Sequence, residues 1–292
     1  MEKLTYTNAA GTEFEFGYSA PYLLQQFSGA GGLEFEVQTV KAPYQDGSTY
    51  LDSLAENREL EVILAILASS MEDLYERRRY LSQVFNPKLG AGTLKYENDY
   101  HIRECEVYLE SAPIYPTSEE HRQGRLLKNC IIQMVATQPF WLDEYQTTEV
   151  LAAVIPCLEF PLEIPEEGIE LGSHSDGILT IDNDGDVEAP LEFEFQGPVE
   201  DPRITNETTG EYIELIVPLL AGESMRIITA FGQKTAVIID ELGAETSAFQ
   251  YLNLNSSFFQ LQRGENTLNF TASAGSDKAE ITIRYRKRYV GI

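Results

Sequence analysis

The segment Asp182-Asn-Asp-Gly-Asp186 has the spacing of carboxylates that opens a calcium-binding loop, where hard oxygen ligands surround the ion. Such a loop also needs glycine at its sixth position and glutamate at its twelfth. Val187 and Phe193 occupy these two positions. We therefore interpret the segment as a hairpin turn between strands at 178–181 and 191–195, and we expect neither a metal site nor a cofactor.

Other candidate catalytic groups lack a supporting pattern. The chain has no G-x-S-x-G elbow and no G-x-x-x-x-G-K-[ST] phosphate loop. The cysteines and histidines share no metal-ligand spacing, and the first two cysteines fall on predicted core strands. The four glutamates on short alternating segments are expected to face solvent. These residues are Cys105, Cys130, Cys157, His101, His121, His174, Glu159, Glu163, Glu192 and Glu194. We predict that the protein is not an enzyme.

Two basic clusters interrupt an acidic chain. The 292 residues include 47 Asp and Glu against 21 Lys and Arg, a formal net charge of −26. The clusters suit either pairing with acidic residues of the same chain, or contact with an acidic copy or another subunit. The candidate contact residues between subunits are Arg77, Arg78, Arg79, Arg286, Lys287 and Arg288.

The overall charge and hydropathy exclude several classes of partner. An acidic surface repels phosphate backbones and anionic lipid, so we expect no stable nucleic-acid binding and no membrane contact. No run approaches the roughly 18–20 apolar residues of a membrane span. The N-terminal residues lack a basic region followed by an apolar run, so we expect no secretory signal and synthesis in a cytoplasm.

The first half contains the predicted positioning elements. Met71–Phe85 has apolar residues at helical spacing, with Ser69 or Ser70 as the cap and Asn86-Pro87 as the stop. Leu60–Leu67 is a nearly continuous apolar run typical of a buried strand. Leu33–Val37 alternates apolar and charged residues, which predicts a half-buried strand. Leu4–Tyr6 and Phe14–Phe16 are expected to pair as a hairpin.

The second half has no helical pattern, and β-type segments recur about every ten residues, which indicates an antiparallel sandwich or barrel. We predict a mainly β (β-dominated α+β) protein with domains at 1–145 and 146–292. The predicted strands of the second half lie near 157–164, 178–182, 190–196, 212–217, 224–229, 235–240, 249–254, 257–261, 266–272 and 279–286.

An ordered set of segments resembles the distal tail protein family of long-tailed, siphovirus-type bacteriophages. The similarity spans most of the chain from about residue 55. The segments are Arg58–Leu64, the helix with Arg77–Leu81, Val84-Phe-Asn-Pro-Lys-Leu-Gly90, Thr93–Tyr96, Gln138-Pro-Phe-Trp141, Ile181–Asp186 with Ala189-Pro190 and Gly197, Leu261–Asn266 and Arg284–Ile292.

The resemblance implies an N-terminal split-barrel-like domain with one helix and a C-terminal galectin-like β-sandwich. It implies a homohexameric ring at the virion tail tip, between the tail-tube protein and the tail-associated lysin or hub protein. The sandwich would hold receptor-binding or peripheral baseplate proteins, and DNA would pass through the ring without binding. If the basic clusters join the subunits, high salt should dissociate the ring.

A carbohydrate-binding module acting in adhesion to the host surface is the alternative. The feature that would favour it is an exposed aromatic platform on the sandwich, with Tyr251, Phe258 and Phe259 as candidates.

Overall fold

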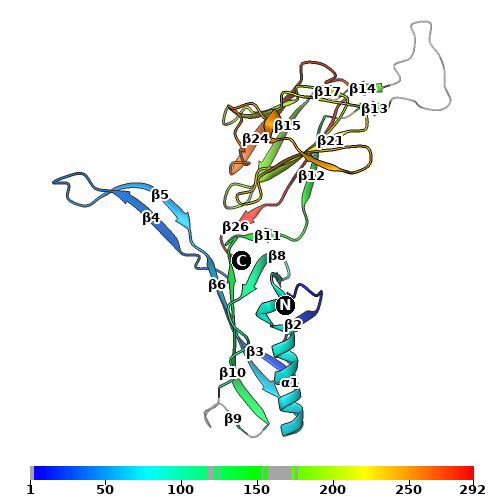
Figure 1. The fold of residues 1–292 in the computed structure, drawn as a ribbon. Coiled ribbons are helices and arrows are strands. Elements are labelled where there is room, and N and C mark those ends of the chain that lie inside the picture. The colour runs from blue at the N-terminus through cyan, green and yellow to red at the C-terminus, as the bar shows by residue number, and fades with distance from the viewer. Residues whose placement is uncertain (1–2, 117–121, 124, 153, 157–171, 175–176) are drawn as a thin grey trace. The chain divides into compact units, whose positions relative to one another are not determined.

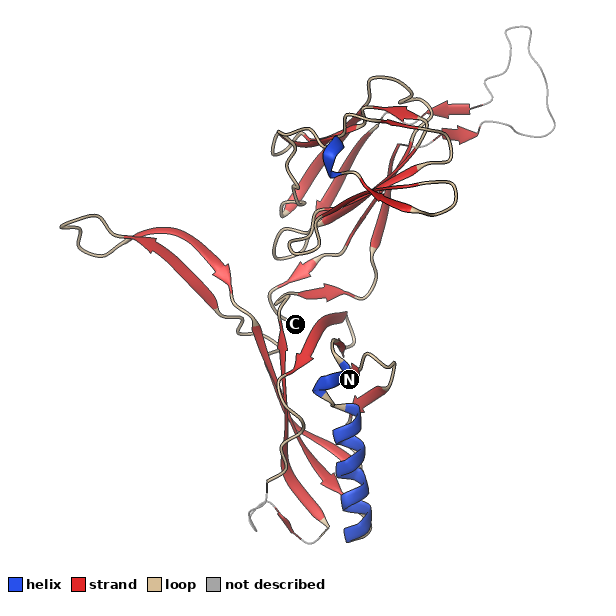
Figure 2. Cartoon of the chain, in the orientation of Figure 1, coloured by secondary structure: helices blue, strands red, loops and turns tan. Residues whose placement is uncertain are grey.

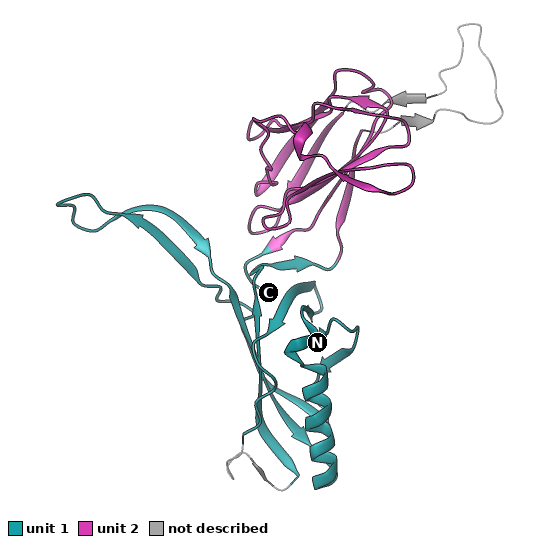
Figure 3. Ribbon diagram, in the orientation of Figure 1, with its two compact units in different colours: residues 1–144, 289–292 teal, residues 145–288 magenta. Residues whose placement is uncertain are grey.

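The computed structural model describes residues 3–116, 122–123, 125–152, 154–156, 172–174 and 177–292 (Figure 1). Figure 3 shows the chain divided into two compact units. Unit 1 comprises residues 1–144 together with 289–292, and unit 2 comprises residues 145–288. The chain therefore enters unit 2 once and then returns, and its last four residues belong to unit 1. The predicted second domain, 146–292, includes these four residues as well.

Unit 1 is built mainly of antiparallel strands, with one α-helix packed alongside them (Figure 2). Its elements are β1 (Lys3–Thr7), β2 (Glu13–Phe16), β3 (Tyr22–Ser28), β4 (Phe35–Val40), β5 (Thr49–Ala55), β6 (Arg58–Leu67), α1 (Met71–Val84), the 3₁₀ turn η1 (Pro87–Leu89), β7 (Gly92–Glu97), β8 (Ile102–Leu109), β9 (Arg122–Gln123), β10 (Leu126–Ala136) and β11 (Trp141–Asp143).

The main sheet of unit 1 follows the order β2-β1-β7-β8-β10-β6-β3. Its two end strands approach each other, because Gly17 bridges to Leu23 and the rings of Phe14 and Tyr22 lie 5.1 Å apart. Leu4 pairs with Phe16 across β1 and β2, which confirms the predicted hairpin. The predicted buried strand Leu60–Leu67 is β6. Closing the ends of the sheet leaves little free edge in this part of the unit.

The helix α1 confirms the prediction for this segment. The Ser70 hydroxyl accepts a hydrogen bond from the backbone N–H of Asp73 at 3.1 Å, which satisfies one free donor of the first turn. The helix ends at Val84, and Asn86 caps the 3₁₀ turn that follows. Leu74 and Leu81 are buried against the sheet, and Phe85 stacks on Tyr6 with centroids 4.8 Å apart. The buried face of α1 therefore completes the core of unit 1.

Strands β4 and β5 form a separate two-stranded hairpin. We call β4, β5 and their connecting loop, residues 35–55, the arm. It extends away from the main sheet of unit 1 (Figure 1). The alternation at Leu33–Val37 predicts a half-buried strand, and this prediction is wrong: every residue of β4 is exposed. No second layer covers the arm within the described part of the chain, so alternation here produces no buried face.

Unit 2 pairs a six-stranded sheet, β12-β25-β16-β21-β22-β23, with a four-stranded sheet, β15-β24-β18-β19. The elements are β12 (Thr147–Ala152), β13 (Val154–Pro156), β14 (Gly172–His174), β15 (Ile178–Asn183), β16 (Leu191–Gln196), β17 (Val199–Glu200), β18 (Arg203–Asn206), β19 (Glu211–Glu214), β20 (Pro218–Leu219), β21 (Ser224–Ile228), β22 (Thr235–Ile239), β23 (Glu245–Ser247), the 3₁₀ turn η3 (Phe249–Tyr251), β24 (Gly264–Thr271), β25 (Glu280–Tyr285) and β26 (Arg288–Tyr289), the last of which crosses the unit boundary.

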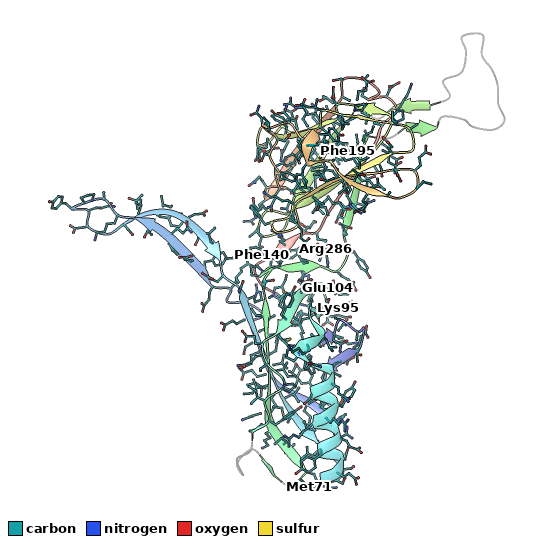
Figure 4. All side chains as sticks on the ribbon, viewed as in Figure 1. Met71, Lys95, Glu104, Phe140, Phe195 and Arg286 are labelled. Carbon is teal, nitrogen blue, oxygen red and sulfur yellow. The ribbon has the colours of Figure 1, made fainter. Side chains whose placement is uncertain are left out.

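Inward side chains of both sheets share one core, which makes unit 2 a sandwich. Phe193 and Phe195 of β16 are fully buried, and Figure 4 labels Phe195 within the unit. Phe193 packs edge-on against Phe259, with centroids 5.7 Å apart. On the opposite face of β16, Glu194 pairs with Arg284 of β25 at 2.6 Å. The mainly β fold predicted from the sequence is thereby confirmed.

Four predictions for the second half need correction or fall outside the described residues. Strand β15 pairs with β24, and β16 pairs with β21 and β25, so Asn183–Gly185 is a connection between two sheets rather than a hairpin turn. The predicted strand 249–254 begins as the 3₁₀ turn η3. The predicted strand 257–261 makes only an isolated bridge at Leu261. The predicted strand 157–164 and Cys157 lie outside the described residues.

Candidate assembly surfaces

The arm presents the most extended exposed apolar surface of unit 1. Val37, Tyr50 and Leu51 are 58%, 60% and 59% exposed, and Leu54 is 47% exposed. An isolated two-stranded hairpin is marginally stable in water, and a long apolar edge is a template for pairing with another chain. Exposed apolar surface of this kind marks an interaction site in a soluble protein. The sequence did not predict this surface, because the alternation at Leu33–Val37 was interpreted as a strand with one buried face.

The arginines of α1 already have partners in their own chain. The Nε atom of Arg77 lies 2.7 Å from the Asp73 carboxylate, one helical turn away. The guanidinium of Arg78 stacks on Tyr115, 4.4 Å from the ring centroid. Arg79 is exposed and lines a shallow recess with Tyr75 and two glutamates. Arg79 is therefore the member of this cluster best placed to meet another molecule.

The second basic cluster is also engaged within unit 2. The ammonium group of Lys287 lies 2.5 Å from the Asp184 carboxylate. The backbone carbonyl of Arg288 accepts a hydrogen bond from the Asp186 N–H at 2.8 Å, and burial lowers the pKa of the Arg288 guanidinium. Arg286, labelled in Figure 4, is half-buried. Of this cluster, Lys287 thus pairs with an acidic residue of its own unit.

The sandwich carries an exposed aromatic surface, which we call the aromatic patch. Phe231 and Phe249 are 64% and 46% exposed, and the rings of Phe249 and Phe258 lie 6.1 Å apart. The ammonium group of Lys234 lies 4.6 Å from the centroid of Phe231 and 5.4 Å from that of Phe258. Of the residues predicted from the sequence, Tyr251 is exposed, Phe258 is half-buried, and Phe259 fills the core.

The groups that could do chemistry are in structural positions. Cys105 and Cys130 are buried free thiols, and burial raises the pKa of each to about 12. A thiol with so high a pKa stays protonated and unreactive at neutral pH. In the residues that the structure describes, no group of three or more His, Cys, Asp or Glu side chains could hold a metal ion. No described helix is long and apolar enough to cross a membrane.

Comparison with known proteins matches both halves of the chain to phage tail families. Residues 9–126 match the family described as "Phage tail protein RIFT-related domain", and residues 184–289 match "Siphovirus-type tail component, C-terminal domain". Together these matches cover more than half of the chain. The match to the RIFT-related domain begins at residue 9. The resemblance seen in the sequence begins only at about residue 55. No curated protein sequence is significantly similar to the chain.

Solved structures share the fold along nearly the whole chain at low sequence identity. The crystal structure of the Dit protein of phage SPP1, described as a paradigm of the hub adsorption apparatus in phages infecting Gram-positive bacteria, has a TM-score of 0.66 and 13% identity, with 98% of each chain covered. A chain of the phage P2 baseplate in its activated conformation with calcium has a TM-score of 0.54 and 12% identity, with 100% of each chain covered.

The two family matches and the shared fold define a structural component of a phage tail. More narrowly, the chain belongs to the siphovirus-type distal tail protein family, which confirms the resemblance drawn from its segments.

Proposed function

We propose that this protein is a structural, non-catalytic hub of the tail tip or baseplate and that six copies close into a ring. In this proposal the ring joins the tail-tube protein to the tail-associated lysin or hub protein, and unit 2 carries receptor-binding or peripheral baseplate proteins. The family supports the tail role, and the structural neighbours are a phage hub protein and baseplate chains. The observation that best supports a ring is the exposed apolar surface of the arm.

The arm supplies the kind of contact that a ring needs. A head-to-tail ring joins two different patches on each subunit, and a projecting element docked on the next copy is such a contact. Covering Val37, Tyr50 and Leu51 removes apolar side chains from water and completes a hairpin that is marginal alone. Arg79, exposed on α1, provides a polar contact at the rim of the same assembly.

The test is the solution mass of the purified chain by light scattering. We expect a mass six times that of the 32.8-kDa chain. Replacing Leu51 and Leu54 by glutamate should reduce it to the monomer, because burying two carboxylates in an apolar contact is costly. Leu242→Glu is the matched control, since Leu242 is 94% exposed in unit 2. An arm variant that keeps the full mass would contradict the proposed contact.

The aromatic patch favours a second function, saccharide binding by the sandwich. Exposed rings can pack against the apolar face of a sugar, and the Lys234 ammonium adds a hydrogen-bond donor beside them. The test is binding of cell-wall polysaccharide from a Gram-positive bacterium to immobilised protein. Phe231→Ala with Phe249→Ala should abolish binding, and Leu242→Ala should not. Equal binding by both variants would contradict this function.

A further inference from the structure

Arg58 is a buried cation at the point where the arm returns to the main sheet. It is the first residue of β6 and follows the end of β5 by three positions. Only 2% of the residue is exposed, and burial lowers the pKa of its guanidinium. The guanidinium lies 5.7 Å from the centroid of Trp141. A buried cation carries a desolvation penalty that an apolar side chain would avoid, so its contacts need a physical explanation.

Those contacts are backbone carbonyls from three distant segments. The Arg58 side chain donates to Gly29 at 2.7 Å, to Pro139 at 2.6 Å and to Val290 at 2.5 Å. Gly29 precedes the arm, Pro139 precedes β11, and Val290 belongs to the four residues that return from unit 2. One guanidinium thus binds the entry of the arm, the end of the main sheet and the returning chain.

The entry segment is also held by groups other than Arg58. The carbonyl of Ala30 accepts hydrogen bonds from the Trp141 indole at 3.1 Å and from the Ile292 N–H at 3.2 Å. Gly29 has φ +94°, and a Cβ there would lie 2.3 Å from the Glu59 carbonyl oxygen. Only glycine fits such a close approach to the neighbouring strand. Several contacts besides those of Arg58 therefore hold Gly29 and Ala30, before the arm, close to the start of β6, which follows it.

We propose that Arg58 is the positioning residue of the arm: it joins the arm's entry and exit to the main sheet and so sets the direction in which the arm leaves unit 1. The reason that direction matters rests on the proposed ring, because a ring closes at one subunit number only if successive copies meet at a fixed angle. Lysine cannot replace arginine here, since one ammonium group lacks the planar fork of five donors.

The experiment measures the arm's direction without using assembly. Spin labels go on Asp46→Cys in the arm and Lys88→Cys in η1, both exposed, in a Cys157→Ser background. Cys105 and Cys130 are buried and stay unlabelled. An excess of unlabelled chain ensures that only distances within one molecule are recorded. We expect one narrow distance distribution, and Arg58→Lys should broaden it at least about twofold.

The controls separate direction from stability. Leu64→Ala, at a buried position of the same strand, should lower the unfolding temperature and leave the distribution narrow. If Arg58→Lys does not fold, Trp141→Phe removes the indole donor to Ala30 and should also broaden the distribution. A broad distribution in the parent protein, or a narrow one in Arg58→Lys, would overturn the proposal. If light scattering shows no six-copy assembly, only the proposed ring is overturned. The spin-label distances are measured within one molecule and do not depend on assembly.

Discussion

Tyr289 lies against the guanidinium of Arg103, whose Cζ atom is 3.7 Å from the centre of the tyrosine ring. Arg103 also pairs with Asp143 at 2.5 Å, and the Tyr289 hydroxyl donates to the same carboxylate at 3.4 Å. These contacts lie within unit 1, although Tyr289 follows all of unit 2 in sequence. The residues after the sandwich thus belong to the fold of the first unit.

Tyr289→Ala should therefore destabilise unit 1 by about 2 kcal/mol, through loss of the cation–π contact and of buried ring area. Trp141, the single tryptophan, is buried in unit 1, so its fluorescence reports the unfolding of this unit. Tyr100→Ala is the control, because Tyr100 is 88% exposed, and it should change stability by less than about 0.5 kcal/mol. Equal midpoints for both variants would show that the returning residues contribute no stability.

Asn266, in strand β24, is expected to be a highly sensitive polar position of unit 2. It is fully buried, donates to the carbonyls of Gln262 and Gly264 at 2.8 Å each, and accepts from the Gln262 N–H at 2.9 Å. Asn266→Ala leaves these backbone groups unpaired and should cost about 2–3 kcal/mol by calorimetry. Asn255→Ala, at an exposed position, should cost almost nothing. Similar losses in both would rule out the buried network as the cause.

The buried thiols predict loss of stability at alkaline pH. The pKa of Cys105 and of Cys130 is about 12 in the folded chain, whereas an ordinary thiol titrates near pH 9. Above pH 9 the unfolded chain loses these protons and the folded chain keeps them, so the free energy of unfolding falls as pH rises towards 12. Below pH 9 their contribution is complete. Cys105→Ala with Cys130→Ala should flatten the decline of the Trp141 midpoint between pH 9 and 11. An identical slope in the double variant would contradict this assignment.

Salt should distinguish the arm from the basic clusters as the main contact of the ring. Each copy has a net charge of −26, so copies repel one another at low ionic strength. Between about 0.01 M and about 1 M salt the screening length falls from about 30 Å to about 3 Å. If the apolar arm joins the copies, the six-copy mass should persist or increase with salt. Dissociation at high salt would instead assign the contact to the arginines and lysines.

The elements predicted correctly are those whose signals lie within a few residues. The helix at 71–84 follows from its apolar spacing, a serine cap and an asparagine-proline stop, all of which act locally. Most of the apolar run at 60–67 is buried in β6, because apolar side chains are stabilised by removal from water. The inward set Leu191, Phe193 and Phe195 follows from simple alternation.

The sequence by itself thus determined the class of fold, the helix, the buried strands and the family. Only the tertiary structure decided which faces are covered and which groups meet. Leu33–Val37 alternates like a buried strand, yet no layer covers β4. Arg58 donates hydrogen bonds to the backbone carbonyls of residues 29, 139 and 290. Every residue has such a carbonyl, so no pattern of side chains in the sequence predicts that site. Local spacing determines how a segment folds, but contacts between distant backbone groups exist only once the chain is folded.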